Sequence, residues 1–213
     1  MSTRTGQQVD DCFREAEAHK ASIDVGILCF AGADLLDIGG PYEVFLTANR
    51  LRAREGMNEP FKVMTVGEPG PVYGGLGLQP THRVDDILKI DVLVVPGAIS
   101  PDDIHPDKIL QQLAPKSDVL ASVCTGSFFL QRNGLLGAGP VTTHWEEVDA
   151  LDHPDVRNDV RWVDNDSIVT AGGLSSGIAM TLHLVERYEG RELAEATARQ
   201  IDYVWEEKRP VSM

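Results

Sequence analysis

The sequence has few positive charges for its length. Nineteen Lys and Arg residues stand against 33 Asp and Glu residues, which gives a formal net charge of −14 at pH 7. Proteins that bind nucleic acid need Lys and Arg to neutralise phosphates, so this composition argues against a nucleic-acid partner. The sequence also contains no apolar run approaching the roughly 18 residues that a membrane helix needs. We therefore expect neither nucleic acid nor a membrane as a partner.

Cysteine is scarce as well, and the three copies are not clustered. Cys12, Cys29 and Cys124 form no C-x-x-C pair and stand in no group with histidine, so neither a disulfide framework nor a structural zinc site is predicted. The first twenty residues are polar and charged and lack the apolar core of a signal peptide. These absences predict a protein of a reducing compartment, the cytoplasm.

The length of the chain favours one domain. With 213 residues, it can bury roughly 70% of its unfolded surface and needs no disulfide or metal to fold. Residues 1–21 are interpreted as an N-terminal extension, in which residues 10–21 could form a helix. Residues 22–213 are interpreted as a single α/β domain.

Short apolar runs alternate with amphipathic segments along this domain. Nearly continuous apolar runs such as 23–30 are typical of buried parallel strands. The predicted strands are 23–30, 61–66, 91–95, the run that ends before Cys124, 140–143, 160–163 and 167–170, with a hairpin or arm at 69–80. The predicted helices are 41–53, where Pro41 suits a first turn, 104–113, 174–188 and 191–205. This alternation predicts a doubly wound, mostly parallel sheet sandwiched by helices, as in flavodoxin-like folds.

The most informative stretch surrounds Cys124. The run 118–123 is apolar and β-branched, small residues follow the cysteine, and a helical pattern closes at Asn133-Gly134. A thiol at a strand–turn–helix junction parallels the nucleophile elbow of hydrolases, and a helix N-terminus favours the thiolate. We therefore expect Cys124 to be a reactive thiolate, whereas Cys29 lies inside an apolar run and is interpreted as structural.

Four loops follow predicted strands and should meet at one edge of the sheet. They contain Asp34 and Asp37, then Gly97 and Ala98, then the turn at Cys124, Thr125 and Gly126, and finally Gly172 and Gly173. Glycine lets backbone N–H groups approach a ligand closely. We expect the amides of residues 97, 98, 124 and 125 to form an anion or oxyanion pocket, while Gly172 and Gly173 either line it or only make a turn.

A nucleophilic thiol needs a partner for proton transfer, and two residues are candidates. His144 follows a short predicted strand, but it can equally cap or bond the backbone. Asp37 lies among apolar neighbours, which tends to raise a carboxyl pKa and suits a general acid or base. The alternative role of Asp37 is to cap the N-terminus of the helix at Pro41, although a residue four positions before the helix start fits that role poorly.

Several of these segments, taken in order, resemble a known family. They are Leu36-Asp37-x-x-Gly40-Pro41, Val95-Pro96-Gly97, Ser122-Val123-Cys124-Thr125-Gly126-Ser127, Gly134-Leu135-Leu136, Thr142-Thr143-His144-Trp145 and Thr170-Ala171-Gly172-Gly173. The set resembles the ThiJ/PfpI superfamily, which implies a class I glutamine-amidotransferase-like fold over about residues 23–203. Within that superfamily it is most similar to isonitrile hydratases and to the ligand-sensing domains of some AraC-type regulators.

The resemblance implies a role for each matching residue. Cys124 matches the nucleophile, Asp37 the acid that bonds it, and Thr125 the hydroxyl residue beside it. Gly97 and Ala98 match the backbone pocket, although the family more often has a second glycine at 98. Thr125 replaces the histidine of peptidase-like members, and Asp37 replaces the glutamate of deglycase-like ones. The hydratases often carry an aspartate where Ala179 stands, which leaves the substrate open.

The resemblance therefore implies a hydro-lyase that converts an isonitrile and water to an N-substituted formamide. It implies a small-molecule substrate, no metal or organic cofactor, and a homodimer. The regulators continue into a DNA-binding region that this sequence does not show, so a DNA-binding role is not expected. Two other classes stay open: a thiol enzyme acting on reactive carbonyls, of the glyoxalase or deglycase type, and a non-enzymatic redox sensor or chaperone.

Overall fold

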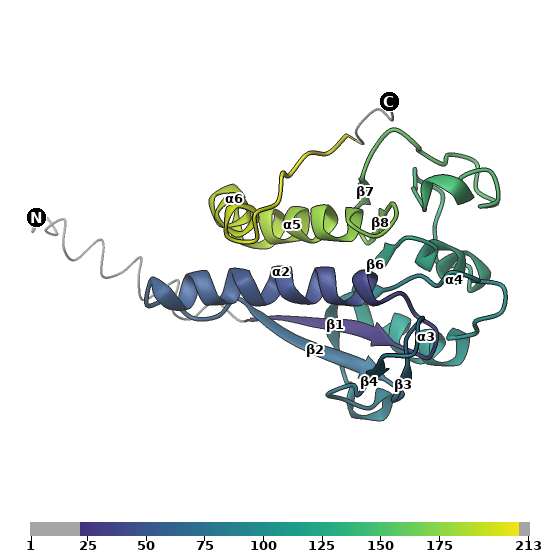
Figure 1. Cartoon of the computed structure of the whole chain (residues 1–213), viewed down its shortest axis with the longest axis horizontal. Helices are drawn as coiled ribbons and strands as arrows, with labels where there is room; N and C mark the ends of the chain where they lie inside the picture. Colours follow the sequence, from purple (N-terminus) through teal and green to yellow (C-terminus); the bar gives the residue numbers. More distant parts are fainter. Residues whose placement is uncertain (1–21, 209–213) are drawn as a thin grey trace, which may run out of the picture.

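A computed structural model describes residues 22–208 and contains a six-stranded sheet. The strands lie in the order β2-β1-β5-β6-β8-β7, and every neighbouring pair is parallel except β7–β8. Their bounds are β1 Ile23–Cys29, β2 Phe61–Gly67, β5 Ile90–Val95, β6 Ser117–Val123, β7 Trp162–Asn165 and β8 Ile168–Ala171. A separate two-stranded hairpin, β3 Gly70–Pro71 and β4 Gly77–Leu78, lies near the carboxyl ends of β1 and β2 (Figure 1).

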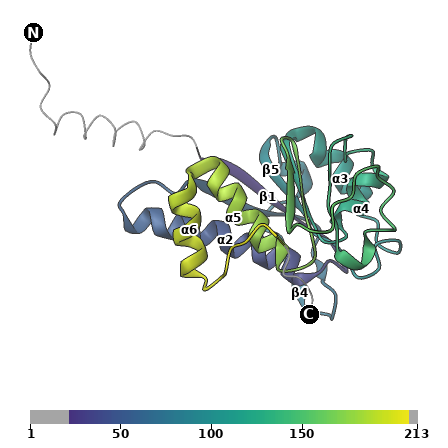
Figure 2. The same cartoon turned by 90° about the horizontal axis from the view of Figure 1, so that it is seen from above.

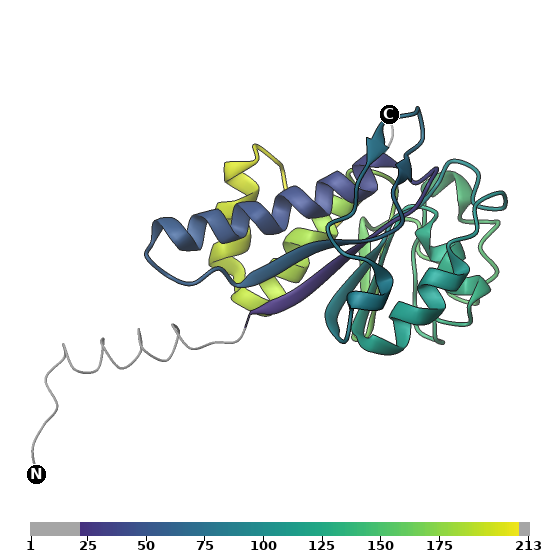
Figure 3. The ribbon, with the colours of Figure 1, turned by 90° about the horizontal axis from the view of Figure 1, so that it is seen from below.

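Helices cover both faces of the sheet. The helices α2 Leu35–Arg54, α5 Ser176–Glu189 and α6 Arg191–Gln200 gather on one side, and α3 Asp107–Leu113 and α4 Gly126–Arg132 lie on the other (Figures 2 and 3). Beyond their first two residues, the central strands β1, β5 and β6 are buried on both faces, and most of the residues there are apolar. The predicted doubly wound, mostly parallel α/β fold is confirmed. The predicted extension over residues 1–21, with Cys12, lies outside the described residues.

Several predicted elements have other bounds in the structure, and three of them differ most. Helix α2 begins at Leu35 rather than at Pro41, because the side chain of Asp34 accepts a hydrogen bond from the Leu36 N–H and caps the helix there. The predicted strand at 140–143 is reduced to one isolated bridge, between Val141 and Val156. Helix α6 stops at Gln200, since Asp202 has φ 54°, a left-handed conformation that ends a helix.

Two further features complete the fold. After α6 the chain runs back beside β7, where the Arg161 N–H donates to the Glu207 carbonyl. Three short 3₁₀ turns, at Val84–Asp86, Ala114–Lys116 and Trp145–Glu147, connect other elements. None of the helices within residues 22–208 is both long and apolar enough to cross a membrane.

Candidate active site

The four loops named from the sequence do meet at the carboxyl edge of the sheet. The backbone N–H of Cys124 donates to the carbonyls of Ala171 (3.1 Å) and Gly172 (3.0 Å), which joins the end of β6 to the end of β8. The N–H of Asp34 donates to the Gly97 carbonyl at 2.9 Å, which joins the start of α2 to the loop after β5. The parallel topology places these loops together because all of these strands end at this edge.

Cys124 occupies a strained turn between β6 and α4. It is 8% exposed and has φ 58°, a left-handed conformation that costs a non-glycine residue about 1–2 kcal/mol. Gly126 permits the turn, since a Cβ atom there would overlap the Val95 carbonyl oxygen. The backbone N–H groups of Thr125 and Leu174 bond the Cys124 sulfur. Strain of this kind, held by surrounding bonds, is typical of functional sites.

Asp37 lies beside this thiol, in the first turn of α2 rather than in the expected loop. Its side chain is completely buried. Oδ2 accepts a hydrogen bond from the Gly97 N–H at 3.0 Å, and Oδ1 has no hydrogen-bond partner among the described residues. Burial raises the pKa of Asp37 from its ordinary 3.8 to about 7, against the opposing effect of the Gly97 amide. The expected raised pKa is therefore confirmed, and the N-cap role belongs to Asp34.

The thiol itself is not the low-pKa group that the helix terminus suggested. Burial, and after it the charge of Asp37, raises the pKa of Cys124 to about 12, although the amides of Thr125 and Leu174 favour the thiolate. The expected thiolate at neutral pH is wrong for this arrangement, because burial and the charge of Asp37 outweigh the two amides. The two groups influence each other and titrate as a pair.

Thr125 has a different task from the one expected. Its hydroxyl donates to the Ala98 carbonyl at 2.6 Å and accepts from the Ala98 N–H at 2.9 Å, so both of its functions serve the loop after β5. Gly97 must be glycine here, since a Cβ atom would lie 2.6 Å from Thr125 Oγ1. Thr125 therefore clamps the loop that carries the Gly97 amide against Asp37.

The expected oxyanion pocket is wrong in three of its four donors. The N–H of Gly97 already bonds Asp37, that of Ala98 bonds Thr125, and that of Cys124 bonds β8. The remaining amide, that of Thr125, bonds the thiol, together with Leu174. These two donors stabilise negative charge on sulfur rather than on a substrate oxygen.

His144 and the glycine pair lie next to this centre. The His144 Nδ1 accepts a hydrogen bond from the Glu146 N–H at 3.3 Å, which is the capping role left open by the sequence. The other edge of the ring packs on Gly173, where a Cβ atom would lie 2.8 Å from Nε2. Gly172 is buried, and its N–H donates to the Arg161 carbonyl at 2.8 Å. The histidine therefore supports the loop at 172–174.

Three residues near the thiol were not singled out from the sequence. Leu174 has φ 49° and supplies an amide to the sulfur, yet nothing in its type predicts a left-handed conformation. Ser127 and Thr143 bond the Cys124 carbonyl. Both stand in motifs that drew attention to a neighbour, Cys124 in one and His144 in the other. Within residues 22–208, no three His, Cys, Asp or Glu side chains gather as a metal site.

Comparisons with known proteins identify relatives of this chain. The chain is 28% identical over 189 residues to an isonitrile hydratase from Pseudomonas putida, covering 85% of this chain and 79% of that protein. It is 28% identical over 186 residues to the HTH-type transcriptional regulator GbdR from Pseudomonas aeruginosa, where it spans 84% of this chain but only 50% of the regulator.

A solved structure extends the likeness to the fold. The crystal structure of a ThiJ/PfpI family protein from Pseudomonas syringae superposes with a TM-score of 0.74 at 21% identity, over 95% of this chain and 81% of that one. A model of the DJ-1/PfpI family matches residues 24–187, which include Asp37, Cys124 and the loops around them. The chain therefore belongs to the DJ-1/PfpI family.

Proposed function

We propose that the protein is a cysteine-dependent isonitrile hydratase-like enzyme, which converts an isonitrile and water to an N-substituted formamide. The observation that carries the proposal is Oδ1 of the buried Asp37, which has no hydrogen-bond partner among residues 22–208, next to the Cys124 thiol at the strand–turn–helix junction. A buried carboxyl oxygen without a partner is costly in a structural role. It is useful where a proton must be accepted and returned. The isonitrile hydratase relative supports the same assignment.

The first half of the reaction forms a covalent thioimidate. The Cys124 sulfur attacks the terminal carbon of R–N≡C while the thiol proton passes to Asp37. Asp37 then gives this proton to the same carbon, which yields R–N=CH–S–Cys124 with the carboxylate restored. The N–H groups of Thr125 and Leu174 stabilise the sulfur as it becomes anionic. A carboxyl with a pKa of about 7 can both take and give a proton near neutral pH.

The second half adds water and releases the product. Asp37 accepts a proton from water, whose oxygen attacks the thioimidate carbon. The proton of the new hydroxyl is transferred to the substrate nitrogen as the carbon–sulfur bond breaks. The product is R–NH–CHO, and the proton held by Asp37 returns to the sulfur. One water is consumed, and no oxidant or reductant is required.

The surroundings of the site suit an uncharged substrate. Large apolar side chains that are exposed directly adjoin four site residues: Leu36 precedes Asp37, Ile99 follows Ala98, Trp145 follows His144, and Leu174 follows Gly173. Exposed apolar side chains next to a site can contact an apolar part of a ligand. They fit the hydrocarbon substituent of an isonitrile better than they fit a charged substrate.

The test is turnover of an aryl isonitrile, followed as appearance of the formamide. We expect the wild-type protein and Cys29→Ser to form the product and Cys124→Ala to form none, because the sulfur carries the intermediate. Methylglyoxal is assayed in parallel. Cys124-dependent turnover of methylglyoxal without formamide would instead indicate the reactive-carbonyl class. Oxidation of Cys124 without turnover of either compound would indicate the redox sensor.

A further inference from the structure

The backbone carbonyl of Cys124 is held by two buried hydroxyls. Thr143 Oγ1 donates to this oxygen at 3.1 Å, and Ser127 Oγ donates to Thr143 Oγ1 at 2.8 Å. Ser127 Oγ also lies 3.3 Å from the same carbonyl oxygen. Both side chains are completely buried, so these bonds do not compete with water.

The segment that carries Thr143 is itself fixed. The backbone N–H of Thr142 donates to Thr170 Oγ1 at 2.8 Å, which ties the segment to β8. The hydroxyl of Thr142 donates to the Arg157 carbonyl at 2.7 Å. Ser127, by contrast, lies in the first turn of helix α4, which directly follows Cys124 and Thr125. Two separate parts of the fold therefore converge on one carbonyl oxygen.

This carbonyl belongs to the same peptide unit as the Thr125 N–H. A peptide unit is planar and rigid, and its carbonyl and N–H point in opposite directions. The Thr125 N–H bonds the Cys124 sulfur. Fixing the carbonyl oxygen on one side therefore fixes the direction of the sulfur's hydrogen-bond donor on the other. Without that anchor, the strained left-handed residue could rotate its peptide and lose the bond to sulfur.

We propose that Ser127 and Thr143 are positioning residues, whose paired hydroxyls hold the Cys124 carbonyl and thereby aim the Thr125 N–H at the Cys124 sulfur. Neither side chain touches the reacting atoms. A role of these two residues in catalysis depends on the proposed function, whereas their effect on the Cys124 thiol does not. The charged groups that act on this thiol are Asp37 and Asp34, and both are retained in every variant used below.

The experiment measures alkylation of Cys124 by iodoacetamide as a function of pH, following the mass of the Cys124 peptide. Thr143→Val removes the hydroxyl at nearly constant shape, and Thr143→Ser keeps it. The matched control is Thr181→Val, since Thr181 is equally buried and its hydroxyl also donates to a backbone carbonyl, that of Gly177, at 2.7 Å. Near-ultraviolet circular dichroism confirms folding, and Ser127→Ala provides the second variant if Thr143→Val does not fold.

We expect Thr143→Val to slow alkylation about tenfold at fixed pH and to move the profile to higher pH, as loss of one hydrogen bond to a charged sulfur implies. Thr143→Ser and Thr181→Val should match the wild type. Ser127→Ala should change the rate in the same direction as Thr143→Val, and the double variant should be at least as slow as Thr143→Val alone, because both hydroxyls reach the same carbonyl oxygen.

The proposal is overturned if folded Thr143→Val and Ser127→Ala both keep the wild-type profile, or if Thr143→Ser is as slow as Thr143→Val. Because alkylation requires no turnover, the outcome is separate from that of the isonitrile assay. The expected alkylation pattern without formamide production would retain the positioning role and reject the proposed function.

Discussion

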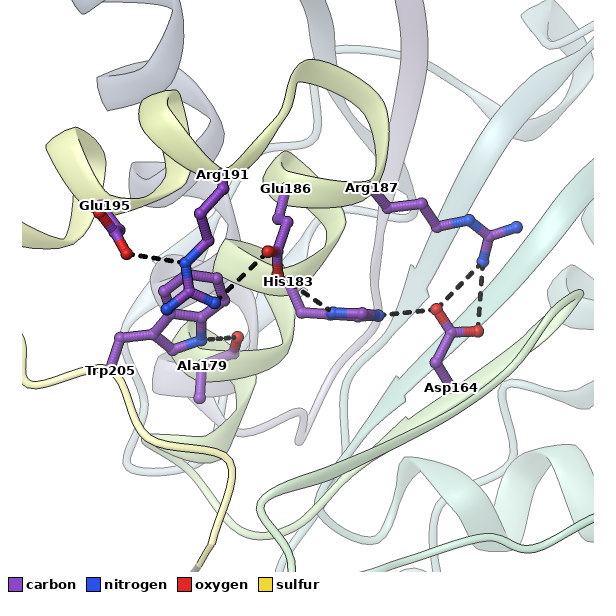
Figure 4. A network of polar contacts seen from close by, with 8 residues as sticks. All are labelled: Asp164, Ala179, His183, Glu186, Arg187, Arg191, Glu195 and Trp205. Atoms are coloured by element: carbon purple, nitrogen blue, oxygen red, sulfur yellow. Dashed lines mark hydrogen bonds and ion pairs between the residues drawn. The ribbon is translucent and has the colours of Figure 1, made fainter.

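Asp37 and Asp164 are the same chemical group in opposite surroundings. Asp164, on the edge strand β7, has its Oδ2 2.7 Å from His183 Nε2 and its Oδ1 3.3 Å from Arg187 Nη1 (Figure 4). Partial burial alone would raise the pKa of Asp164, but the hydrogen bond from His183 and the charge of Arg187 outweigh it and lower the pKa. Among the described residues Asp37 meets no cation, and burial raises its pKa although the Gly97 amide opposes this effect.

The difference separates a carboxylate that is held ionised by cations from one that can exchange a proton near neutral pH. Asp164 belongs to a network in which charges compensate one another, and Glu186 continues it through Arg191 (Figure 4). Such a group stays ionised and exchanges no proton near neutrality. Asp37 lacks compensation, which leaves its proton available near neutral pH and allows its charge to act on Cys124.

The largest effect is expected on turnover. Asp37→Asn should lower the rate of formamide production about 10²–10⁴-fold, which is the usual contribution of a general acid–base group. Asp34→Asn is the control, because asparagine also caps helices well and Asp34 bonds Leu36 rather than the reacting centre. Steady-state kinetics of both variants provides the measurement. A larger loss of turnover in Asp34→Asn than in Asp37→Asn would show that Asp37 is not the residue that transfers the proton.

The same substitution should stabilise the protein at alkaline pH. The pKa of Asp37 rises from 3.8 in the unfolded chain to about 7 in the folded protein. The contribution of this group to the free energy of unfolding is therefore fully present below pH 3.8 and is lost as the pH rises through 7. Three pKa units correspond to about 4 kcal/mol at most. Asparagine stays neutral, so Asp37→Asn should raise the free energy of unfolding by up to about 4 kcal/mol above pH 7.

Urea unfolding at several pH values measures this gain. Well below pH 3.8 the wild type and Asp37→Asn should be equally stable, because both side chains are then uncharged in both states. A gain that is the same at every pH would mean that the charge of Asp37 is not its source.

The opposite and smaller effect is expected at Asp164. Its pKa is lowered in the fold, so its contribution is present above the unfolded pKa and disappears as pH falls through the folded value. Asp164→Asn should therefore destabilise the protein at pH 7 by about 1 kcal/mol or less, the range for partly exposed ion pairs. The loss should vanish in strong acid, and turnover should stay unchanged. A drop in turnover without unfolding would contradict the separation of the two regions.

Much of the fold could be predicted because buried parallel strands leave a strong pattern. The runs that became β1, β5 and β6 are mostly apolar, with polar residues chiefly near their starts, and their order in the chain implied which loops would meet. The start of α2 could not be predicted from Pro41, because the Asp34 cap competes with proline as a helix signal and forms earlier. The homodimer that the family resemblance implies stays a prediction.

The site also has features that could be predicted from the sequence and features that could not. Cys124 and Asp37 could be identified because their positions follow from the strand pattern. Their pKa values depend on burial and on the partners of each atom, which the sequence does not state. The helix-terminus argument for a low thiol pKa failed because burial and the charge of Asp37 outweigh two amides. The roles of Leu174, Ser127 and Thr143 follow from backbone directions at one turn, for which their residue types carry no signal.

The central claim is that the charge of Asp37 acts on the Cys124 thiol. It is tested most directly by the rate of Cys124 alkylation against pH in the wild type, Asp37→Asn and Asp164→Asn. Because the negative charge of Asp37 raises the thiol pKa, Asp37→Asn should alkylate faster and ionise at lower pH while its isonitrile turnover falls. Asp164→Asn should match the wild type. An unchanged or higher thiol pKa in folded Asp37→Asn would contradict the account.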